Sequence, residues 1–385
     1  MKFIHIADMH FDSPFVNLSE RELLGDKRRL EQRKIFKKII EYIKQEKVDN
    51  LFISGDLYEH KYIKQSTIEY INNLFKEIPE TQIYIAPGNH DPYLKNSYYN
   101  KYKWNKNVKI FEGQIEKIET QEADIYGYGF NDFYCTNSGI EEIKIENRSK
   151  PQILIIHGTL NGANIEEKQY NSITTKQLEQ IGFDYVALGH IHKPDYATNK
   201  IVYPGSTSAL GFDEPGEHGM IVGNIEKIGN EEKTKIELKF VPLDEEKFIK
   251  KEIDVTGLNS KEELIEKINE TEIKNNEYIE IILIGKRNFE INKYEIEKYI
   301  ENEKIIKIKN KTKIAYDLKK LENETTLKGL FVKEILNRYE QSDLSEEEQE
   351  VIEKAIEIAF DALEWCFWGR SKKTSLSIKN KLNLL

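Results

Sequence analysis

Short apolar runs alternate with amphipathic stretches along the first part of the chain. Runs rich in β-branched residues predict strands, and apolar positions that recur every three or four residues predict helices. We therefore expect strands at 3–7, 51–54 and 82–86, and helices at 26–47 and 65–78. Strands that alternate with helices in this way build a largely parallel sheet buried on both faces.

Further elements follow in the sequence. Apolar runs predict strands at 153–156 and 185–188, and Gly-rich segments at 125–130, 202–205 and 219–225 suggest antiparallel additions. Residues 248–317 then have a β-α-β-α-β pattern and contain neither His nor Cys. We divide the chain into a domain at 1–245, a small α/β capping domain at 246–320 and a helical C-terminal region at 321–385.

The C-terminal region has a strong helical pattern. Ser345 and Glu348 form a capping-box signature, and apolar residues follow at helical spacing as far as Leu363. Its apolar candidates for packing are Leu330, Phe331, Ile335, Leu336, Tyr339, Phe360, Trp365 and Trp368. They either cover the capping domain or bind a partner protein.

Composition narrows the class of protein. The 385 residues include 57 Lys and Arg against 67 Asp and Glu, a net charge of −10, which argues against nucleic-acid binding by bulk positive potential. No apolar run approaches the roughly 18 residues that span a bilayer, and Asp8 comes too early for a signal peptide. Cys135 and Cys366 form no CxxC pattern. We expect a cytoplasmic protein without disulfides or a membrane anchor.

The eight histidines all lie at or before His218, and most belong to five short motifs that follow predicted strands. The motifs are Asp8-Met9-His10, Gly55-Asp56, Gly88-Asn89-His90-Asp91, His157-Gly158 and Gly189-His190-Ile191-His192. Because ligands gather beyond the carboxyl ends of strands in α/β sheets, we expect these side chains to lie together. Each motif alone is a weak signal, but all five in this order indicate one site.

The donor set of these motifs suits metal ions. Two Asp, one Asn and four His combine oxygen and imidazole ligands, a mixture that fits Mn, Fe or Zn better than Ca or Mg alone. Seven ligands are too many for one ion and suit two, with a bridging carboxylate, for which Asp56 is the natural candidate. The glycines beside them permit tight turns close to a phosphate.

This set of motifs resembles the calcineurin-like metallophosphoesterase superfamily. Within it the chain is similar to the SbcD family of DNA double-strand-break repair nucleases, and most of all to its bacterial YhaO-type branch. The segments that carry the narrower likeness are HIADMHFDSPF (5–15), GDLY (55–58), GNHDPY (88–93), GHIHKP (189–194) and YPGSTSALGFDE (203–214). The resemblance implies an α/β (α+β) fold with a four-layer α-β-β-α sandwich.

The resemblance also implies roles for the residues of the motifs. Asp8, His10 and His192 hold one metal, while Asn89, His157 and His190 hold the other, and Asp56 bridges. His90 is the general acid or transition-state donor, and Asp91 orients it. Two divalent ions are implied, with Mn²⁺ expected and Mg²⁺, Fe²⁺ or Zn²⁺ as alternatives. In archaeal and eukaryotic relatives a His stands three residues after the bridging Asp, whereas here Glu59 stands there and His60 follows, which we interpret as an exposed loop His.

A basic and aromatic stretch follows His90. It holds Lys101 and Lys103 with Tyr98 and Tyr99, a combination that suits phosphate contacts and base stacking, or alternatively a loop that packs onto the domain. His5 is expected to be structural, and His218 to lie at the surface.

The resulting hypothesis is two-metal hydrolysis of DNA phosphodiester bonds. The resemblance implies duplex ends and single-stranded DNA as substrates, a role in repair or recombination, an SbcC-like coiled-coil ATPase as partner, and a possible homodimer. The alternatives are a phosphatase or cyclic-nucleotide phosphodiesterase with the same site, and a DNA-end binding scaffold without turnover.

Overall fold

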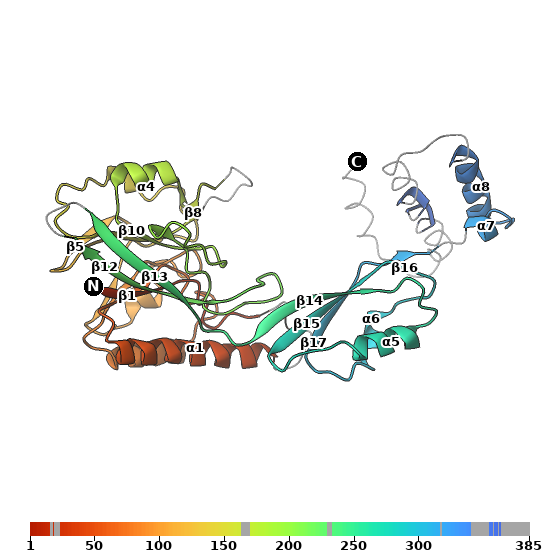
Figure 1. Ribbon diagram of the computed structural model, residues 1–385, viewed down its shortest axis with the longest axis horizontal. Helices are drawn as coiled ribbons and strands as arrows, with labels where there is room; N and C mark the ends of the chain where they lie inside the picture. Colours follow the sequence, from red (N-terminus) through yellow and green to blue (C-terminus); the bar gives the residue numbers. More distant parts are fainter. Residues whose placement is uncertain are drawn as a thin grey trace. The chain divides into compact units, whose positions relative to one another are not determined.

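The computed structural model describes residues 1–15, 18, 24–162, 170–228, 233–315, 318–339, 354–356, 358–360 and 362. Its chain is a mixed α/β fold with several sheets (Figure 1). The described residues form two compact units. The first comprises 1–251, 272–280 and 303–307, and the second comprises the described parts of 252–271, 281–302 and 308–385.

The first large sheet has six strands in the order β13-β12-β1-β2-β3-β4. Its strands are β1 (Lys2–Ile6), β2 (Asn50–Ile53), β3 (Gln82–Ile85), β4 (Val108–Ile110), β12 (Gly219–Lys227) and β13 (Thr234–Pro242). The four strands β1 to β4 run parallel, because the helices α1 (Leu24–Glu46) and α2 (Gln65–Lys76) carry the chain back between the first three. The strands β12 and β13 are antiparallel, as their Gly-rich segment suggested.

The second large sheet has five strands in the order β11-β10-β7-β6-β5. Its strands are β5 (Glu116–Glu119), β6 (Asp124–Tyr128), β7 (Gln152–His157), β10 (Tyr185–Gly189) and β11 (Ile201–Val202). Of the antiparallel pairing expected at 202–205, the structure has only an isolated bridge between Asp195 and Tyr203, whereas β11 itself pairs in parallel with β10. The loop over 190–200 carries the chain back before β11 begins, and this return sets the direction of β11.

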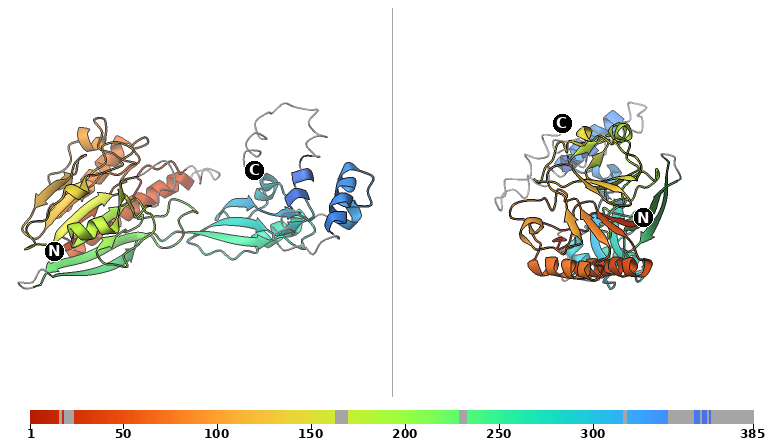
Figure 2. Two further views of the ribbon diagram at one scale, coloured as in Figure 1. Left: turned by 90° about the horizontal axis from the view of Figure 1, so that it is seen from above. Right: turned by 90° about the vertical axis from the view of Figure 1, so that its left-hand side faces the viewer.

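The two sheets and their helices stack in four layers (Figure 2). Alternate residues of β1 face opposite sides, so that Phe3 packs between the sheets while Ile4 packs towards α1 and α2. In the same way Ile153 of β7 faces the first sheet, whereas Leu154 packs with Leu178 of α4 (Thr175–Ile181) on the outer face. Because both faces of each sheet are buried, the central strands have continuous apolar sequences. The predicted α-β-β-α layering is confirmed.

Small differences from the predicted helices have local causes. Leu30 is an apolar residue of the predicted helix at 26–47 but is 58% exposed, because the buried face of α1 runs through Ile35, Ile39 and Ile43. The short helix α3 (Tyr98–Lys101) and the short strands β8 (Thr159–Leu160) and β9 (Ser172–Ile173) had not been predicted.

The segment at 247–314 has the predicted β-α-β-α-β order. Its sheet has the order β14-β15-β17, and its elements are β14 (Lys247–Asp254), α5 (Lys261–Asn269), β15 (Glu277–Ile284), α6 (Lys293–Glu297) and β17 (Ile305–Asn310). Ser260 and Asn292 cap the two helices with their side chains. Each strand contributes residues to both compact units, and the predicted domain boundaries stay a prediction.

The end of the chain is described in part. The strands β16 (Lys286–Arg287) and β18 (Lys313–Ile314) pair, and the helices α7 (Leu318–Leu321) and α8 (Leu327–Tyr339) follow. Val332 of α8 packs with Ile356 and Phe360, while Leu330 is exposed. The predicted capping box at 345–348, Leu363, Cys366 and the two tryptophans lie outside the described residues. Within the described ranges, no helix is both long and apolar enough to cross a membrane.

Candidate functional site

The ends of five strands bring the predicted ligands together. Asp8 and His10 follow β1, Asp56 follows β2, and Asn89 to Asp91 follow β3 in the first sheet. From the second sheet, His157 ends β7, and His190 and His192 follow β10. The carboxyl ends of strands in both sheets therefore meet at one place, as the placement of the motifs after strands predicted.

The backbone at this place adopts unusual conformations. Asp8, His10 and Asp56 have φ values of 51°, 47° and 52°, and His190 has a φ of 103°. The left-handed region costs about 1–3 kcal/mol for a residue with a side chain and clusters at functional sites. Neighbouring loops hold the strained turns, since Asp8 N–H donates to the carbonyl of Gly55 at 3.1 Å and His10 N–H to that of Asp56 at 2.9 Å.

Two glycines allow the sheets to approach each other here. A Cβ on Gly189 would overlap the carbonyl oxygen of Ser54, and one on Gly55 would overlap the imidazole of His157. Gly55 also has a φ of 88°. Any side chain at these positions would push β10 and β7 away from β2, so the glycines set the closeness of the ligands.

The first cluster of donors comprises His10, His192 and Asp8. The Nε2 atoms of His10 and His192 lie 3.2 Å apart, and Asp8 Oδ1 is 3.9 Å from His192 Nε2. The other ring nitrogens are taken by carboxylates: His10 Nδ1 donates to Glu59 at 2.8 Å, and His192 Nδ1 donates to Glu214 at 2.6 Å. Both imidazoles therefore turn Nε2 towards the centre of the site.

The second cluster comprises His157, Asn89 and Asp56. His157 Nε2 lies 3.0 Å from Asn89 Oδ1 and 3.4 Å from Asp56 Oδ2. Its Nδ1 donates to the carbonyl of Ser54 at 2.8 Å, so its Nε2 carries the lone pair. Asp56 also lies close to the first cluster, because its Oδ2 is 3.7 Å from His10 Nε2.

This donor chemistry fits divalent cations. Burial alone would lower the pKa of His192, but the hydrogen bond to Glu214 and the charge of Asp8 raise it to about 9. The Nε2 atoms of His10 and His192 therefore share a proton at 3.2 Å, and a divalent cation would take the place of that proton. The His157 lone pair faces two acceptor oxygens. Asp56 lies between the two clusters, in the position of a bridging carboxylate.

His190 is placed less closely than the other predicted ligands. Its ring lies edge-on to that of His157, with centroids 5.2 Å apart, and its backbone N–H donates to both oxygens of Asp8. His190 is in none of the groups of three His or carboxylate donors that converge among the described residues, whereas His90 forms one such group with His10 and Asp56. On its other side the ring of Tyr170 lies at 5.1 Å, a neighbour that no sequence motif indicated.

His90 lies at the open side of the site. Its side chain is 45% exposed, whereas that of His157 is fully buried. The ring stands nearly perpendicular to that of His10, with centroids 4.8 Å apart. His90 Nδ1 donates to Glu59 Oε2 at 2.9 Å, so Glu59 accepts from both His10 and His90.

The expectation that Asp91 orients His90 is therefore wrong. The buried carboxylate of Asp91 accepts hydrogen bonds from the backbone N–H groups of Gly88, Asp56 and Leu57 and from the hydroxyl of Tyr99. It ties the loop after β2 to the loop after β3. Burial and the nearby charge of Asp56 raise the pKa of Asp91 to about 8 in spite of these bonds.

The charges at the site shift its titrating groups strongly. Burial alone would lower the pKa of His90, but the hydrogen bond to Glu59 and the charges of Asp56 and Glu59 raise it to about 9. Burial alone would raise the pKa of Glu59, but the hydrogen bonds from His10 and His90 lower it to about 2. His90 is thus protonated at neutral pH and Glu59 is ionised.

The predicted substrate contacts in the basic and aromatic stretch after His90 are partly buried and partly exposed. Tyr99, a predicted substrate contact, is buried and donates to Asp91 at 2.6 Å, because it belongs to the core. Tyr98 and Trp104 also pack against that core, and the indole of Trp104 donates to the carbonyl of Tyr98. Only Lys101 and Lys103 of the predicted contacts lie fully at the surface.

Three histidines lie outside the cluster. His5 is fully buried, as expected, with its nitrogens on the hydroxyls of Tyr185 and Ser54 at 2.9 and 3.0 Å. The surface placement of His218 is wrong: it is buried against Ser206 and the carbonyl of Glu214. His60 is half-buried against Phe133 and is not an exposed loop residue.

Sequence reasoning gave no role to Glu59 or Glu214. Glu59 directly follows the segment GDLY, and Glu214 ends YPGSTSALGFDE. Their hydrogen bonds to histidines depend on loops that come together only in the folded chain. No sequence signal could have found them, because Glu59 is 31 residues from His90 and Glu214 is 22 residues from His192.

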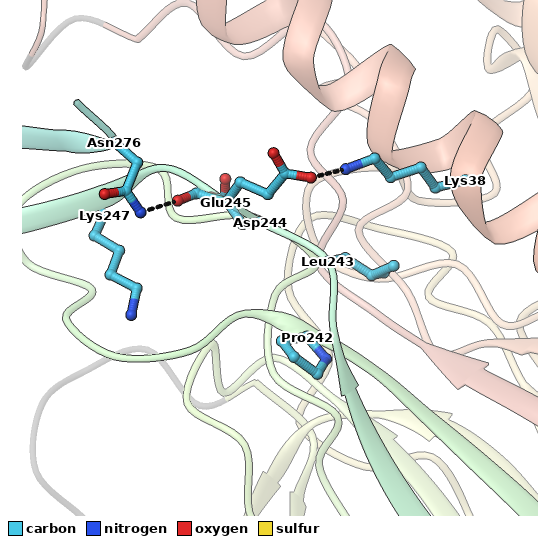
Figure 3. A pocket seen from close by; sticks show the side chains of 7 residues that line it. All are labelled: Lys38, Pro242, Leu243, Asp244, Glu245, Lys247 and Asn276. Carbon is cyan, nitrogen blue, oxygen red and sulfur yellow. Dashed lines mark hydrogen bonds and ion pairs between the residues drawn. The ribbon is translucent and has the colours of Figure 1, made fainter.

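A separate hollow lies beside α1, where β13 ends and β14 begins (Figure 3). Its lining is Lys38, Pro242, Leu243, Asp244, Glu245, Lys247 and Asn276. Lys38 pairs with Glu245 at 2.6 Å, and Asn276 donates to the carbonyl of Glu245 at 2.8 Å. Since these groups bind one another, the hollow carries no candidate chemistry.

The chain is similar to known proteins. Residues 1–194 match the calcineurin-like phosphoesterase family. The chain is 29% identical over 231 residues to YhaO of Bacillus subtilis, an uncharacterized metallophosphoesterase, and the alignment covers 57% of this chain and 56% of the relative. It is 27% identical over 248 residues to the SbcD component of the nuclease SbcCD of Staphylococcus epidermidis, covering 56% and 63%. The chain thus spans less than two thirds of either relative.

One solved structure similar to the chain is TT1561 of Thermus thermophilus. The sequences are 11% identical, the TM-score is 0.34, and the match covers 57% of this chain and 92% of the other.

Proposed function

Since this chain belongs to the calcineurin-like phosphoesterase family and so to the metal-dependent hydrolases of phosphoesters, we propose that it is a nuclease that hydrolyses DNA phosphodiester bonds. One observation carries the proposal: two clusters of donors share Asp56, and His90 lies beside them on the open side. The likeness to a nuclease component of Staphylococcus epidermidis supports a nucleic acid as the substrate.

The residues of the site have distinct roles in this proposal. Asp8, His10 and His192 hold one divalent cation, Asn89, His157 and His190 hold a second, and Asp56 is shared. Bound there, two cations neutralise a phosphate and lower the pKa of water, from 15.7 towards about 7. We propose Mn²⁺ as the metal, with Mg²⁺, Fe²⁺ or Zn²⁺ as alternatives that share these ligands.

His90 acts on the leaving group. Its Nδ1 proton is held by Glu59, which leaves Nε2 for proton exchange with the departing oxygen. The hydrogen bond to Glu59 favours the protonated ring, which can give the leaving alkoxide its proton. Asp91 serves this chemistry indirectly, by fixing the loops that carry Asp56 and His90.

Contacts with DNA lie beyond the catalytic cluster. We place Lys101 and Lys103 in contact with the phosphate backbone, since both are exposed in the segment that follows His90. Charge reversal of both would weaken DNA binding and flatten its dependence on salt. The C-terminal region at 321–385 would bind an SbcC-like coiled-coil ATPase. The proposal includes a role in DNA repair in the cytoplasm.

A nuclease assay tests the proposal. The protein is given labelled duplex, hairpin and single-stranded DNA with Mn²⁺, Mg²⁺ or a chelator, and in parallel bis-p-nitrophenyl phosphate, an aryl phosphomonoester and cAMP. Metal-dependent cleavage of DNA supports the nuclease. Hydrolysis of a small ester or cAMP without DNA cleavage would instead identify a phosphatase or cyclic-nucleotide phosphodiesterase. DNA binding without turnover of any substrate would identify a scaffold.

A further inference from the structure

Glu59 contacts two histidines with its two oxygens. Its Oε1 accepts a hydrogen bond from His10 Nδ1 at 2.8 Å, and its Oε2 accepts one from His90 Nδ1 at 2.9 Å. The two rings stand at 84° to each other on either side of this carboxylate. One side chain therefore reaches both a proposed metal ligand and the proposed proton donor.

An ionised carboxylate only accepts hydrogen bonds, so both rings must present an Nδ1–H group to Glu59. In His10 this selects the Nδ1–H tautomer, and in the protonated His90 it orients the ring. The Nε2 lone pair of His10 is then directed at the site, 3.2 Å from His192 Nε2 and 3.7 Å from Asp56 Oδ2. In His90 the same arrangement leaves Nε2 as the atom that exchanges a proton.

The backbone holds Glu59 in place for this task. Its N–H donates to the carbonyl of Phe11 at 3.0 Å, and its own carbonyl accepts from Tyr62 and Ile63 at 2.9 and 2.8 Å. The next residue, His60, donates its N–H to the carbonyl of His90 at 2.9 Å. The loop that carries Glu59 is thus bound to the loops after β1 and β3, and the side chain itself is 15% exposed.

No other carboxylate takes this role in the part of the chain that the structure describes. The carboxylate of Asp91 is occupied by three backbone N–H groups and Tyr99. Glu214 contacts His192, on the other side of the first cluster.

We propose that Glu59 is a shared positioning residue, which sets the metal ligand His10 and the proton donor His90 through one carboxylate. The role of His90 rests on the proposed function, whereas the two hydrogen bonds do not. Only a side chain with two acceptor atoms at this reach can do both. The substitution Glu59→Gln would keep one acceptor and present an amide N–H₂ to the other ring, and Glu59→Ala would remove both acceptors.

The experiment compares Glu59→Gln and Glu59→Ala with His90→Ala and the double variant Glu59→Gln/His90→Ala. Glu69→Gln is the matched control, because Glu69 is exposed on α2 and contacts Gln65. Three quantities are measured on the full chain: the affinity for Mn²⁺ from the free ion in electron paramagnetic resonance, the His tautomers from long-range ¹H–¹⁵N spectra of the protein without metal, and kcat and KM for bis-p-nitrophenyl phosphate at saturating Mn²⁺.

We expect Glu59→Gln to weaken Mn²⁺ binding by about 10- to 100-fold, as loss of a partner to a metal-bound imidazole does. This loss should remain when His90 is already Ala, since it acts through His10. At saturating Mn²⁺, kcat should fall by at least about tenfold with KM nearly unchanged, and this loss should disappear in the His90→Ala background. The spectra should show that the ring facing the amide N–H₂ no longer donates from Nδ1 in Glu59→Gln, and that neither ring does so in Glu59→Ala.

Two results would overturn the proposal. One is Mn²⁺ affinity and kcat in Glu59→Gln equal to those of Glu69→Gln. The other is unchanged Nδ1–H signals of both rings in Glu59→Gln, which is nearly isosteric and reports even if Glu59→Ala fails to fold. Mn²⁺ affinity and tautomers do not depend on the substrate. If DNA is not cleaved but these readouts change as expected, the nuclease proposal fails and the role of Glu59 at His10 stands.

Discussion

Asp8 and Asp254 both stand at or just after the end of a β-strand, yet their surroundings are opposite. Asp8 is buried beside His192 and Asp56 in a left-handed conformation, and burial raises its pKa. Asp254 ends β14 at the surface and accepts a hydrogen bond from the backbone N–H of Thr256 at 2.8 Å. Asp8 is therefore one of several polar groups that different strands bring together, whereas Asp254 closes a local turn.

The difference extends to the regions that hold these residues. The first 245 residues and the segment 246–315 share an alternation of strands and helices, but only the first contains His. A strand end therefore becomes a reaction site when several strands bring donors of complementary chemistry to it. The β-α-β alternation alone builds a layer and carries no chemistry.

The largest expected effect comes from removing the shared carboxylate. Asp56→Asn should abolish phosphodiesterase activity, by more than about 1,000-fold, because an amide neither bridges two cations nor balances their charge. Turnover of bis-p-nitrophenyl phosphate and Mn²⁺ binding both measure the effect. Asp254→Asn is the matched control and should behave like the wild type. If both substitutions impair activity equally, the contrast between the two strand ends fails.

The sequence predicts part of this site, because some of its residues directly follow apolar runs that can be recognised as strands. Asp8, Asp56, Asn89 and His157 could be placed together because each follows an apolar run whose direction in a sheet is fixed. Asp91, Glu59 and Tyr99 could not, because their partners belong to separate loops. A carboxylate next to His90 in sequence looks like its partner, but the turn of that loop directs Asp91 to backbone N–H groups instead.

The fold shows the same division. The parallel order of β1 to β4 and the four layers follow from patterns of apolar residues that are local in the sequence. The direction of β11 and the burial of His218 depend on the path of the chain after β10. The spacing of apolar residues does not predict that path. Leu30 illustrates a smaller limit, since an apolar residue at the margin of a helix face can stay exposed.

A second prediction separates the proton donor from the metal ligands within the histidine-rich region. His90→Ala should lower kcat by about 100- to 10,000-fold, the usual contribution of a general acid, with Mn²⁺ affinity within a few-fold of the wild type. Steady-state kinetics and metal titration measure the two quantities. His60→Ala is the control, because His60 is adjacent in space but bonded to His90 only through its backbone. A large loss of Mn²⁺ binding in His90→Ala would make His90 a ligand instead.

A smaller effect is expected at the other carboxylate beside the first cluster. Glu214→Gln should weaken Mn²⁺ binding by about 10- to 100-fold through His192, whose Nδ1 donates to Glu214 at 2.6 Å. Saturating Mn²⁺ should restore most of kcat, since Glu214 has no hydrogen bond to His90. Titration with Mn²⁺ followed by assays at increasing metal concentration tests this. A loss of kcat that metal does not restore would show that Glu214 acts on the reaction itself.

The smallest effect concerns stability, and it also distinguishes the two regions. Burial lowers the pKa of His5 from 6.5 to about 3, so folding favours its neutral form. The contribution to stability is complete above pH 6.5 and is lost as the pH falls from 6.5 towards 3. Between pH 7 and pH 5, this loss amounts to about 2 kcal/mol in the free energy of unfolding.

Urea unfolding of the wild type and of His5→Gln at pH 7 and pH 5, both with chelator, measures this contribution. The wild type should lose about 2 kcal/mol more than the variant over this interval, whatever the variant's stability at pH 7. Other groups titrate in both proteins, so the difference isolates His5. Residues 246–315 contain no His and should add nothing in this range. Parallel losses in the two proteins would mean that His5 accepts a proton between the sheets without cost, and the contact with Tyr185 and Ser54 would then have to bind the charged ring.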